Sequence, residues 1–326
     1  MPSSAKPPPA YQRPLPSPSV VISTVGVQGR EAAHLTPALT LLADELRRSD
    51  GPAVVERARF IDRVGWENEV FIAYWLRRED FDRWFSRLLP WWDAPDREVG
   101  EVGLWREIID VPSARIENIY SSPSFSVGTG RLVPDATGPI ETHGYWGSMR
   151  HRLGAAATDA LEGATPRPET EGDPEDTGSR RVRVDVPRNL AIIRSGQDTS
   201  RCAPDERAEY ETSILPVLRA GMEYLRDHRQ DSGCLASRFL QELDPTGRPT
   251  ERSFGHAMFR SLGDLERWAE RHPTHLAIYH RFSNFAKRRG ANLKLDLWHE
   301  VAVIEPERAL FEYVNCHAAT GLLGQV

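Results

Sequence analysis

The sequence predicts an α+β protein in which helices pack against an antiparallel sheet. Strand-like and helix-like segments alternate irregularly along the 326 residues, an order that suits antiparallel pairing better than a doubly wound parallel sheet. No G-x-G-x-x-G or other phosphate-binding glycine loop follows a strand-like run, which argues against a nucleotide cofactor. A third observation is a pattern, a strand-like run followed by D-[FL]-x-x-W, that occurs once in each half of the chain.

The individual elements follow from apolar periodicity. Apolar residues that alternate or run together, bounded by turn residues, predict strands at 19–24, 181–186, 189–196 and 293–304. Apolar residues that recur every three or four positions predict helices at 36–49 and 205–228.

The repeated pattern is the main evidence on domain organisation. Residues 69–92 pass from a strand-like run into an amphipathic helix, and residues 254–282 do the same, with Ser261 or Asp264 as the N-cap of the helix. A strand followed by an amphipathic helix is common, so the pattern favours an internal duplication without establishing it.

Two segments of biased composition bound the halves. Residues 1–18 are rich in Pro and Ser and predict a loose arm, and residues 163–181 combine Pro, Gly and acidic residues as a surface loop or linker does. The first half is therefore expected at 19–162 and the second at 182–326.

Composition limits the partners of the chain. Apolar residues make up 40%, charged residues 27%, and the formal net charge is −6, which disfavours docking on nucleic acid or an anionic membrane. No apolar run approaches the ~20 residues of a membrane helix, and residues 1–18 lack the apolar core of a signal peptide, so a cytoplasmic location is expected. The three cysteines are too few and too scattered for a disulfide framework.

Two histidines stand in strand-like runs near the C-terminus. In 293–304 the alternation places His299 on the same face as the leucines and valines, where it is either a core histidine bonded to a carbonyl or a neutral metal ligand of the kind that haem requires. His317 follows the end of the next apolar run, where it is either a surface or capping histidine or a mobile acid/base group.

Two further polar residues are candidates for a pocket. Arg194 ends an apolar strand, so it needs an anion or a polar ligand beside it, unless it forms a salt bridge with Asp198 or another carboxylate. Ser237 lies in 230–243, which has an amphipathic helical pattern, and is either a helix-surface hydroxyl or a pocket donor; no G-x-S-x-G surrounds it. The aromatic stretch 141–152 lines a pocket entrance or forms a packed turn.

Five stretches, in this order, carry a resemblance to a known family: ETHGYWGSMRHR, LAIIRSGQDTS, GCLASRF, LKLDLWHEV and FEYVNCHAATGLLG. With them, the sequence resembles the haem-containing aldoxime dehydratases, the family that includes phenylacetaldoxime dehydratase. The stretches span residues 141–324, and the N-terminal third agrees mainly around the Trp-rich segment that ends in PWW.

The resemblance implies a dimeric α+β barrel of two ferredoxin-like halves that binds haem b, with ferrous iron in the active form, and converts aldoximes to nitriles and water. By the same resemblance His299 is the proximal iron ligand, His317 is the distal acid/base residue, and Arg194 and Ser237 surround the aldoxime hydroxyl. A haem-binding or haem-sensing protein, or a haem peroxidase of the dimeric α+β barrel type, is the alternative.

Some positions depart from the family pattern. Thr142 separates Glu141 from His143, so the role of that carboxylate stays open, and Asp159 and Glu162 are further acidic candidates. A shift of one residue places Ala236 where the family has its serine, and Ser232 is also close to Ser237 in sequence.

Overall fold

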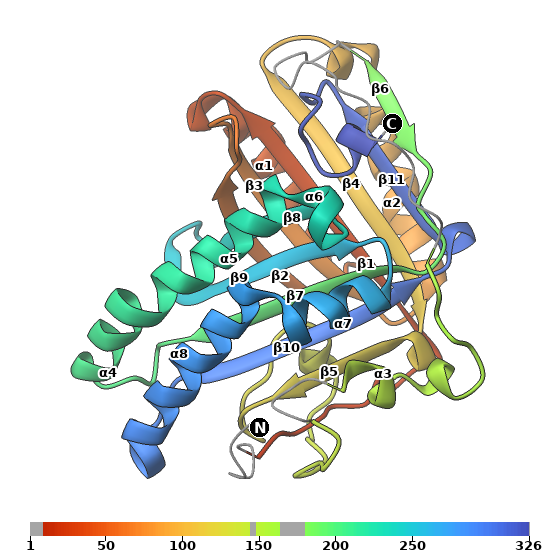
Figure 1. Ribbon diagram of the computed structural model, residues 1–326. Helices are drawn as coiled ribbons and strands as arrows, with labels where there is room; N and C mark the ends of the chain where they lie inside the picture. Colours follow the sequence, from red (N-terminus) through yellow and green to blue (C-terminus); the bar gives the residue numbers. More distant parts are fainter. Residues whose placement is uncertain (1–8, 144–147, 164–179, 326) are drawn as a thin grey trace.

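The computed structural model describes residues 9–143, 148–163 and 180–325. Within these residues the chain forms one antiparallel sheet with the strand order β5-β10-β7-β9-β8-β2-β3-β1-β4-β11-β6 (Figure 1). The prediction of an α+β protein with an antiparallel sheet and helices packed against it is confirmed.

The first half of the chain supplies four adjacent strands and two helices. Its strands follow the sheet order β2-β3-β1-β4, and a helix follows the first and the third strand along the chain. The elements are β1 (Ser19–Gly29), α1 (Ala32–Leu46), β2 (Val54–Ile61), β3 (Glu67–Trp75), α2 (Arg78–Trp92) and β4 (Val102–Pro112).

The second half repeats this order. Its strands follow the order β8-β9-β7-β10, again with helices after the first and the third strand along the chain. The elements are β7 (Leu190–Asp198), α4 (Pro204–Glu209), a π-helical turn (Tyr210–Ile214), α5 (Leu215–Asp227), α6 (Arg229–Ser232), β8 (Cys234–Leu243), β9 (Pro249–Phe259), α7 (Leu262–Arg271), α8 (Pro273–Arg289) and β10 (Asp296–Ile304).

Short strands tie the two halves together. After β4, strand β5 (Ile116–Tyr120) pairs with β10 of the second half, and after β10, strand β11 (Ala309–Val314) pairs with β4 of the first. Strand β6 (Arg181–Val184) extends the sheet beside β11, and β2 meets β8 through three residue pairs only. Helix α3 (Met149–Arg152) lies between β5 and β6 in the sequence.

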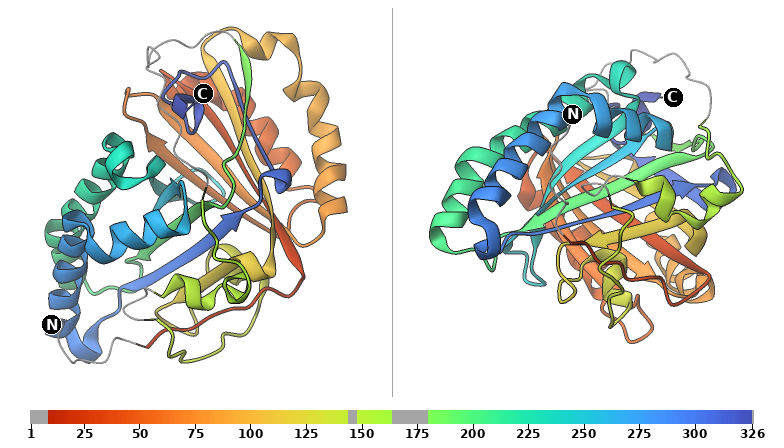
Figure 2. Two further views of the ribbon diagram at one scale, coloured as in Figure 1. Left: turned by 45° about the vertical axis from the view of Figure 1, so that its right-hand side comes forward. Right: turned by 60° about the horizontal axis from the view of Figure 1, so that its bottom comes forward.

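The molecule has helices on the two outer faces of the sheet and a core between its two halves (Figure 2). Helices α1 and α2 pack on the outer face of the first half, and α5, α7 and α8 cover the outer face of the second. The inner faces of both halves meet in a third cluster that includes Ile22, Ile72, Leu240 and Trp298. Each strand of β7–β10 therefore has one face toward this core and one toward the helices.

Most predicted elements are confirmed, but only residues 230–232 of the stretch 230–243 are helical, as the end of α6. From Cys234 onward the stretch forms β8, whose side chains point in turn to the core between the two halves and to the helices, which is a period of two. Ser261, not Asp264, is the N-cap of α7, since its Oγ accepts a hydrogen bond from the backbone N–H of Asp264. Strands β2, β4 and β5 were not predicted.

The N-terminal arm is not loose where the structure describes it. Arg13 is buried, its backbone N–H donates to the Oδ1 of Asn118, and its guanidinium donates to three carbonyl oxygens of residues 123–134. Residues 1–8 and most of the expected linker, 164–179, lie outside the described residues. Among the described residues no helix is long and apolar enough to cross a membrane, and all three cysteines are buried thiols.

Candidate active site

His299 lies at the centre of a buried polar cluster. On β10 it shares the helix-facing side with Val301 and Val303, as the alternation predicted, and it is 5% exposed. Its Nε2 is 2.9 Å from Oε1 of Glu117 on β5 and 3.0 Å from Nη2 of Arg152 on α3. The same nitrogen therefore donates to Glu117 when it carries a proton and accepts from Arg152 when it does not.

Glu117 and Arg152 form an ion pair beside this imidazole. The Nε of Arg152 donates to Oε2 of Glu117 at 2.7 Å, and its Nη2 donates to Oε1 at 3.1 Å. Burial acts to raise the pKa of Glu117, but the charges and hydrogen bonds of His299 and Arg152 outweigh it, so the pKa lies below its ordinary value. Glu117 is therefore a carboxylate at neutral pH. We call Glu117, Arg152 and His299 the outer-face cluster.

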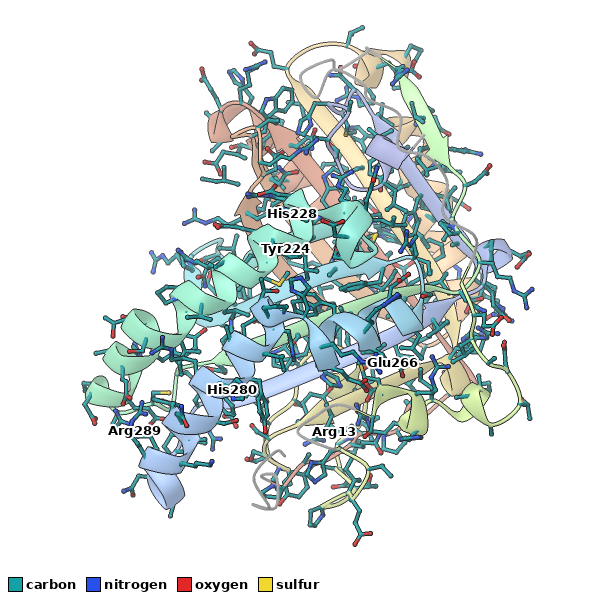
Figure 3. All side chains as sticks on the ribbon, viewed as in Figure 1. Arg13, Tyr224, His228, Glu266, His280 and Arg289 are labelled. Atoms are coloured by element: carbon teal, nitrogen blue, oxygen red, sulfur yellow. The ribbon has the colours of Figure 1, made fainter. Side chains whose placement is uncertain are left out.

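Short contacts hold the helix that carries Arg152. The Nη1 of Arg152 donates to the carbonyl oxygen of Thr142 at 2.8 Å. The neighbouring Arg150 binds Glu266 of α7, with 2.8 Å between Nη2 and Oε2; Figure 3 labels Glu266 where α7 comes near α3. Helix α3, although only one turn long, is thus fixed to both the sheet and the helical layer.

The sheet beside His299 carries small side chains. Across the strands His299 pairs with Ser195 of β7, Ser195 pairs with Gly255 of β9, and Gly255 pairs with Phe239 of β8. Ser195 is exposed although both neighbouring strands pair with β7, so the helices leave this part of the sheet uncovered. A Cβ on Gly255 would lie 2.7 Å from Cε of Met222 on α5, so glycine lets the Met222 side chain approach the sheet closely here.

His275 stands in the first turn of α8, in the helical layer over this sheet. Its Nδ1 is buried and has no hydrogen-bond partner among the residues that the structure describes. Burial lowers the pKa of His275 to about 4, while a hydrogen bond with the backbone of Ala269 acts in the opposite direction. The edge of the ring meets Trp268 of α7, with 4.7 Å between ring centroids. A neutral imidazole with an unpaired nitrogen is what coordination to a metal requires.

Arg194, a predicted site residue, faces away from His299. It pairs in register with Glu300, one residue after His299, so both point to the inner face of the sheet. Its Nη2 is 2.7 Å from Oε2 of Glu56 and its Nη1 is 2.9 Å from Oε1 of Glu300, with Tyr74 also bonded. Arg194 thus forms salt bridges with Glu56 and Glu300 and not with Asp198, and its role at a substrate stays a prediction.

His317 and Ser237 are also bound elsewhere. The Nδ1 of His317 accepts from the backbone N–H of Ala319 at 3.2 Å, so Nε2 carries the proton and donates to Oδ2 of Asp62 at 2.8 Å. The Oγ of Ser237 donates to the carbonyl oxygen of Met222 at 3.1 Å. The structure therefore does not bring His299, His317, Arg194 and Ser237 together in one pocket.

Four residues of the candidate site are not among those predicted from the sequence, although the sequence contains a signal for each of them. Arg152 lies in the aromatic stretch 141–152, and Ser195 is the residue after Arg194, on the opposite face of the same strand. Glu117 is an acidic residue inside a short apolar strand, and His275 lies in the repeated strand–helix segment 254–282. The acidic candidates Asp159 and Glu162 lie apart from the cluster: Asp159 binds Arg115, and the backbone of Glu162 binds Asn189.

The family model described as haem-containing dehydratase matches residues 23–322. The aliphatic aldoxime dehydratase of Rhodococcus erythropolis is 37% identical over 309 residues, which cover 93% of this chain and 86% of that protein. The phenylacetaldoxime dehydratase of Bacillus sp. (strain OxB-1) is 31% identical over 307 residues, which cover 93% of this chain and 87% of the relative.

The fold agrees with the solved structures of two aldoxime dehydratase chains. A crystal structure of an aldoxime dehydratase in complex with butyraldoxime superposes with a TM-score of 0.88 at 35% identity and covers 98% of this chain and 90% of that chain. A second aldoxime dehydratase crystal structure gives the same TM-score, 0.88, at 35% identity, and covers 100% of this chain and 94% of the other.

Proposed function

The chain belongs to the haem-containing dehydratase family, and we propose that it is an aldoxime dehydratase, a lyase that converts R–CH=N–OH to R–C≡N and water. The reaction removes one proton from carbon and one hydroxyl from nitrogen, with no net change in oxidation state. The observation that carries the proposal is the outer-face cluster, a buried histidine between a carboxylate and an arginine beside an uncovered part of the sheet.

The residues present fit a haem between α8 and the sheet. His275 offers a buried nitrogen that has no partner within 9–143, 148–163 and 180–325, and the small Ser195 and Gly255 leave room on the facing strands. Met222, which approaches Gly255, is an unbranched and flexible side chain that can move aside for a planar group. We therefore assign His275, rather than His299, as the ligand of the haem iron. When bound, ferrous haem supplies electron density that weakens the N–O bond of the oxime.

His299 is then the acid/base group. The hydroxyl is a poor leaving group, and proton transfer by a positioned side chain typically contributes ~10²–10⁴-fold. The Nε2 of His299 lies 2.9 Å from Oε1 of Glu117 and 3.0 Å from Nη2 of Arg152, so a hydrogen-bond partner is in place whether or not that nitrogen carries a proton. The protonated ring gives its proton to the departing hydroxyl, and the neutral ring takes the proton from carbon.

Ser195 and Arg152 position the substrate in this proposal. Ser195 lies opposite His299 in register, so its hydroxyl is available to the same atoms as the imidazole. Arg152 is held by Glu117 and by the carbonyl oxygen of Thr142, which fixes its guanidinium before substrate binds. Both act by orientation and electrostatics and not by proton transfer.

The finer features of the fold and the cofactor are part of the same proposal. The common strand and helix order of the two halves supports two ferredoxin-like units, and the family resemblance supports a homodimer with haem b and ferrous iron. Sedimentation analysis tests the dimer, and a pyridine haemochrome spectrum tests the haem type.

A direct assay tests the function. Purified protein is reduced with dithionite under anaerobic conditions and mixed with butyraldoxime or phenylacetaldoxime, and nitrile is measured by chromatography. We expect nitrile to form only with the reduced, haem-loaded protein. Absence of a Soret band, or peroxide-dependent oxidation without nitrile formation, would contradict the proposal and favour a haem peroxidase.

A further inference from the structure

A cavity of about 520 Å³ opens between the two halves of the sheet, and none of the outer-face cluster lines it. Strands β2 and β8 pair only through Arg57–Arg59 and the facing residues 241–243, and beyond these pairs they separate. The cavity lies along the unpaired parts, residues 60–61 of β2 and 236–239 of β8, and α5 also contributes side chains to its wall. We call it the inter-half cavity.

The inter-half cavity is rich in positive charge, although the whole chain carries a formal charge of −6. Six arginines line it against three acidic residues, and one of these acids, Asp62, is bonded to His317. Three of the arginines make no ion pair with any residue that the structure describes: Arg59, Arg63 and Arg219. They are exposed to solvent at the cavity, so their charge is available to a ligand.

Two other arginines of the cavity, Arg238 and Arg226, are instead paired with carboxylates. Arg238 is buried at the cavity wall, and both of its Nη atoms bond to Glu107, the longer at 2.7 Å. Arg226 binds Asp227 at 2.8 Å. The edge of β8 adds backbone groups, because Ala236–Phe239 receive no ladder hydrogen bonds from β2. Guanidinium groups and unpaired strand-edge N–H groups are both donors that suit carboxylate and phosphate oxygens.

We propose that the inter-half cavity is a second ligand site that binds a small organic dianion with carboxylate or phosphate groups. A volume of about 520 Å³ is within the range of sites for small molecules. Arg59 and Arg63 belong to the first half and Arg219 to the second, so a bound dianion bridges the two halves where their strands no longer pair. Met222 lines the cavity and also approaches Gly255, so the cavity borders the proposed haem site, but its ligand differs in chemistry from an uncharged aldoxime.

Calorimetric titration of the full-length, haem-loaded protein tests this site. The probes are glycerol phosphate for phosphate groups and succinate for carboxylates, both dianions at mildly alkaline pH, each at low and at high ionic strength. We expect saturable binding of at least one probe that weakens with salt, since exposed charges are screened. Arg63→Gln and Arg219→Gln should each weaken binding about tenfold, the equivalent of one charge-assisted hydrogen bond.

Arg281→Gln on α8 is the matched control, because it removes the same charge from an exposed residue that does not line the cavity. It should bind the probes as the parent does, and thermal unfolding of all variants should confirm that they are folded. Equal weakening in Arg281→Gln would show nonspecific attraction and overturn the proposal, as would the absence of saturable binding. Binding to haem-free protein that is abolished by haem would also overturn it, because the cavity would then belong to the haem site.

Discussion

Strands β7 and β10 bear polar groups on both faces. Those on the inner face are enclosed by other side chains, whereas those on the outer face lie beside a part of the sheet that is exposed to solvent. On the inner face, Arg194 lies between Glu56 and Glu300 with the rings of Phe254 and Trp298 on its guanidinium, at 4.5 and 5.0 Å from the ring centroids. On the outer face, Ser195 and His299 are the sequence neighbours of Arg194 and Glu300, and they lie beside a part of the sheet that the helices do not cover.

This difference separates groups that support folding from groups that can react. Separating a buried charge from its partners has a large cost, so the inner-face network, in which both Nη atoms of Arg194 are bonded, is suited to fixing the two halves against each other. The outer-face cluster gives one imidazole nitrogen two alternative partners, one for each protonation state, next to the exposed Ser195. A change of protonation there requires little rearrangement, which is the property that an acid/base group needs.

The largest effect is expected from His275→Ala. Removing the only proposed protein-to-iron bond should leave a folded protein that has lost most of its haem and all measurable nitrile formation. The Soret absorbance per chain, with circular dichroism as the control for folding, is the measurement. Parent-like haem content would show that another residue holds the iron.

The second-largest effect is expected from His299→Ala. Turnover should fall by ~10²–10⁴-fold with a much smaller change in KM, because an acid/base group acts mainly in the transition state. His317→Gln is the comparison, since the side chain of His317 is bonded to Asp62 away from the cluster, and it should keep turnover near the parent value. The reverse pattern would make His317 the distal group.

On the inner face, Arg194→Met should act on stability. It leaves Glu56 and Glu300 buried without their cation, which should lower the free energy of unfolding by ~3–5 kcal/mol, while the folded protein keeps its turnover. Arg308→Gln, which removes an ion pair to Asp110 at 3.0 Å near the surface, should cost less than ~1 kcal/mol. Denaturant unfolding measures both, and a stable but inactive Arg194→Met would assign Arg194 to the site.

The inner face should also respond to pH through Glu242. Burial, followed by the negative charge of Glu56, raises the pKa of Glu242 to about 7, although Arg252 and Arg194 act against this. Because the folded state holds this proton more tightly than the unfolded state, the stabilisation is full at low pH and is lost as pH rises to about 7. Glu242→Gln should remove ~1–3 kcal/mol of this pH dependence in unfolding experiments. If the free energy of unfolding depends on pH in the same way in Glu242→Gln and the parent, the role of Glu242 is contradicted.

The smallest expected effect is on kcat/KM, and it distinguishes Ser195 from Ser237. Ser195→Ala should lower kcat/KM about tenfold, the loss expected from one hydrogen bond to substrate. Ser237→Ala should change it by less than about twofold, because the Ser237 hydroxyl is bonded to the backbone of Met222. Equal rates for the parent and Ser195→Ala would remove Ser195 from the proposed site.

The sequence allowed much of the fold to be predicted, but less of the site. Periodicity located the strands that contain His299 and Arg194 and the face on which His299 lies, since these depend on neighbours along the chain. It could not indicate that β5 crosses to pair with β10, which brings Glu117 to His299 over 182 residues of sequence. Arg194 and Ser195 show the limit most clearly: adjacent residues on a strand face opposite sides, and only the sheet order shows which side is open.

The most direct test is the haem content of His275→Ala and His299→Ala, measured side by side by absorption of the reduced proteins. If His275 holds the iron and His299 is the acid/base group, His275→Ala loses the Soret band while His299→Ala keeps both the band and the parent spectrum. Loss of haem from His299→Ala, with haem retained in His275→Ala, would contradict the assignment and make His299 the iron ligand.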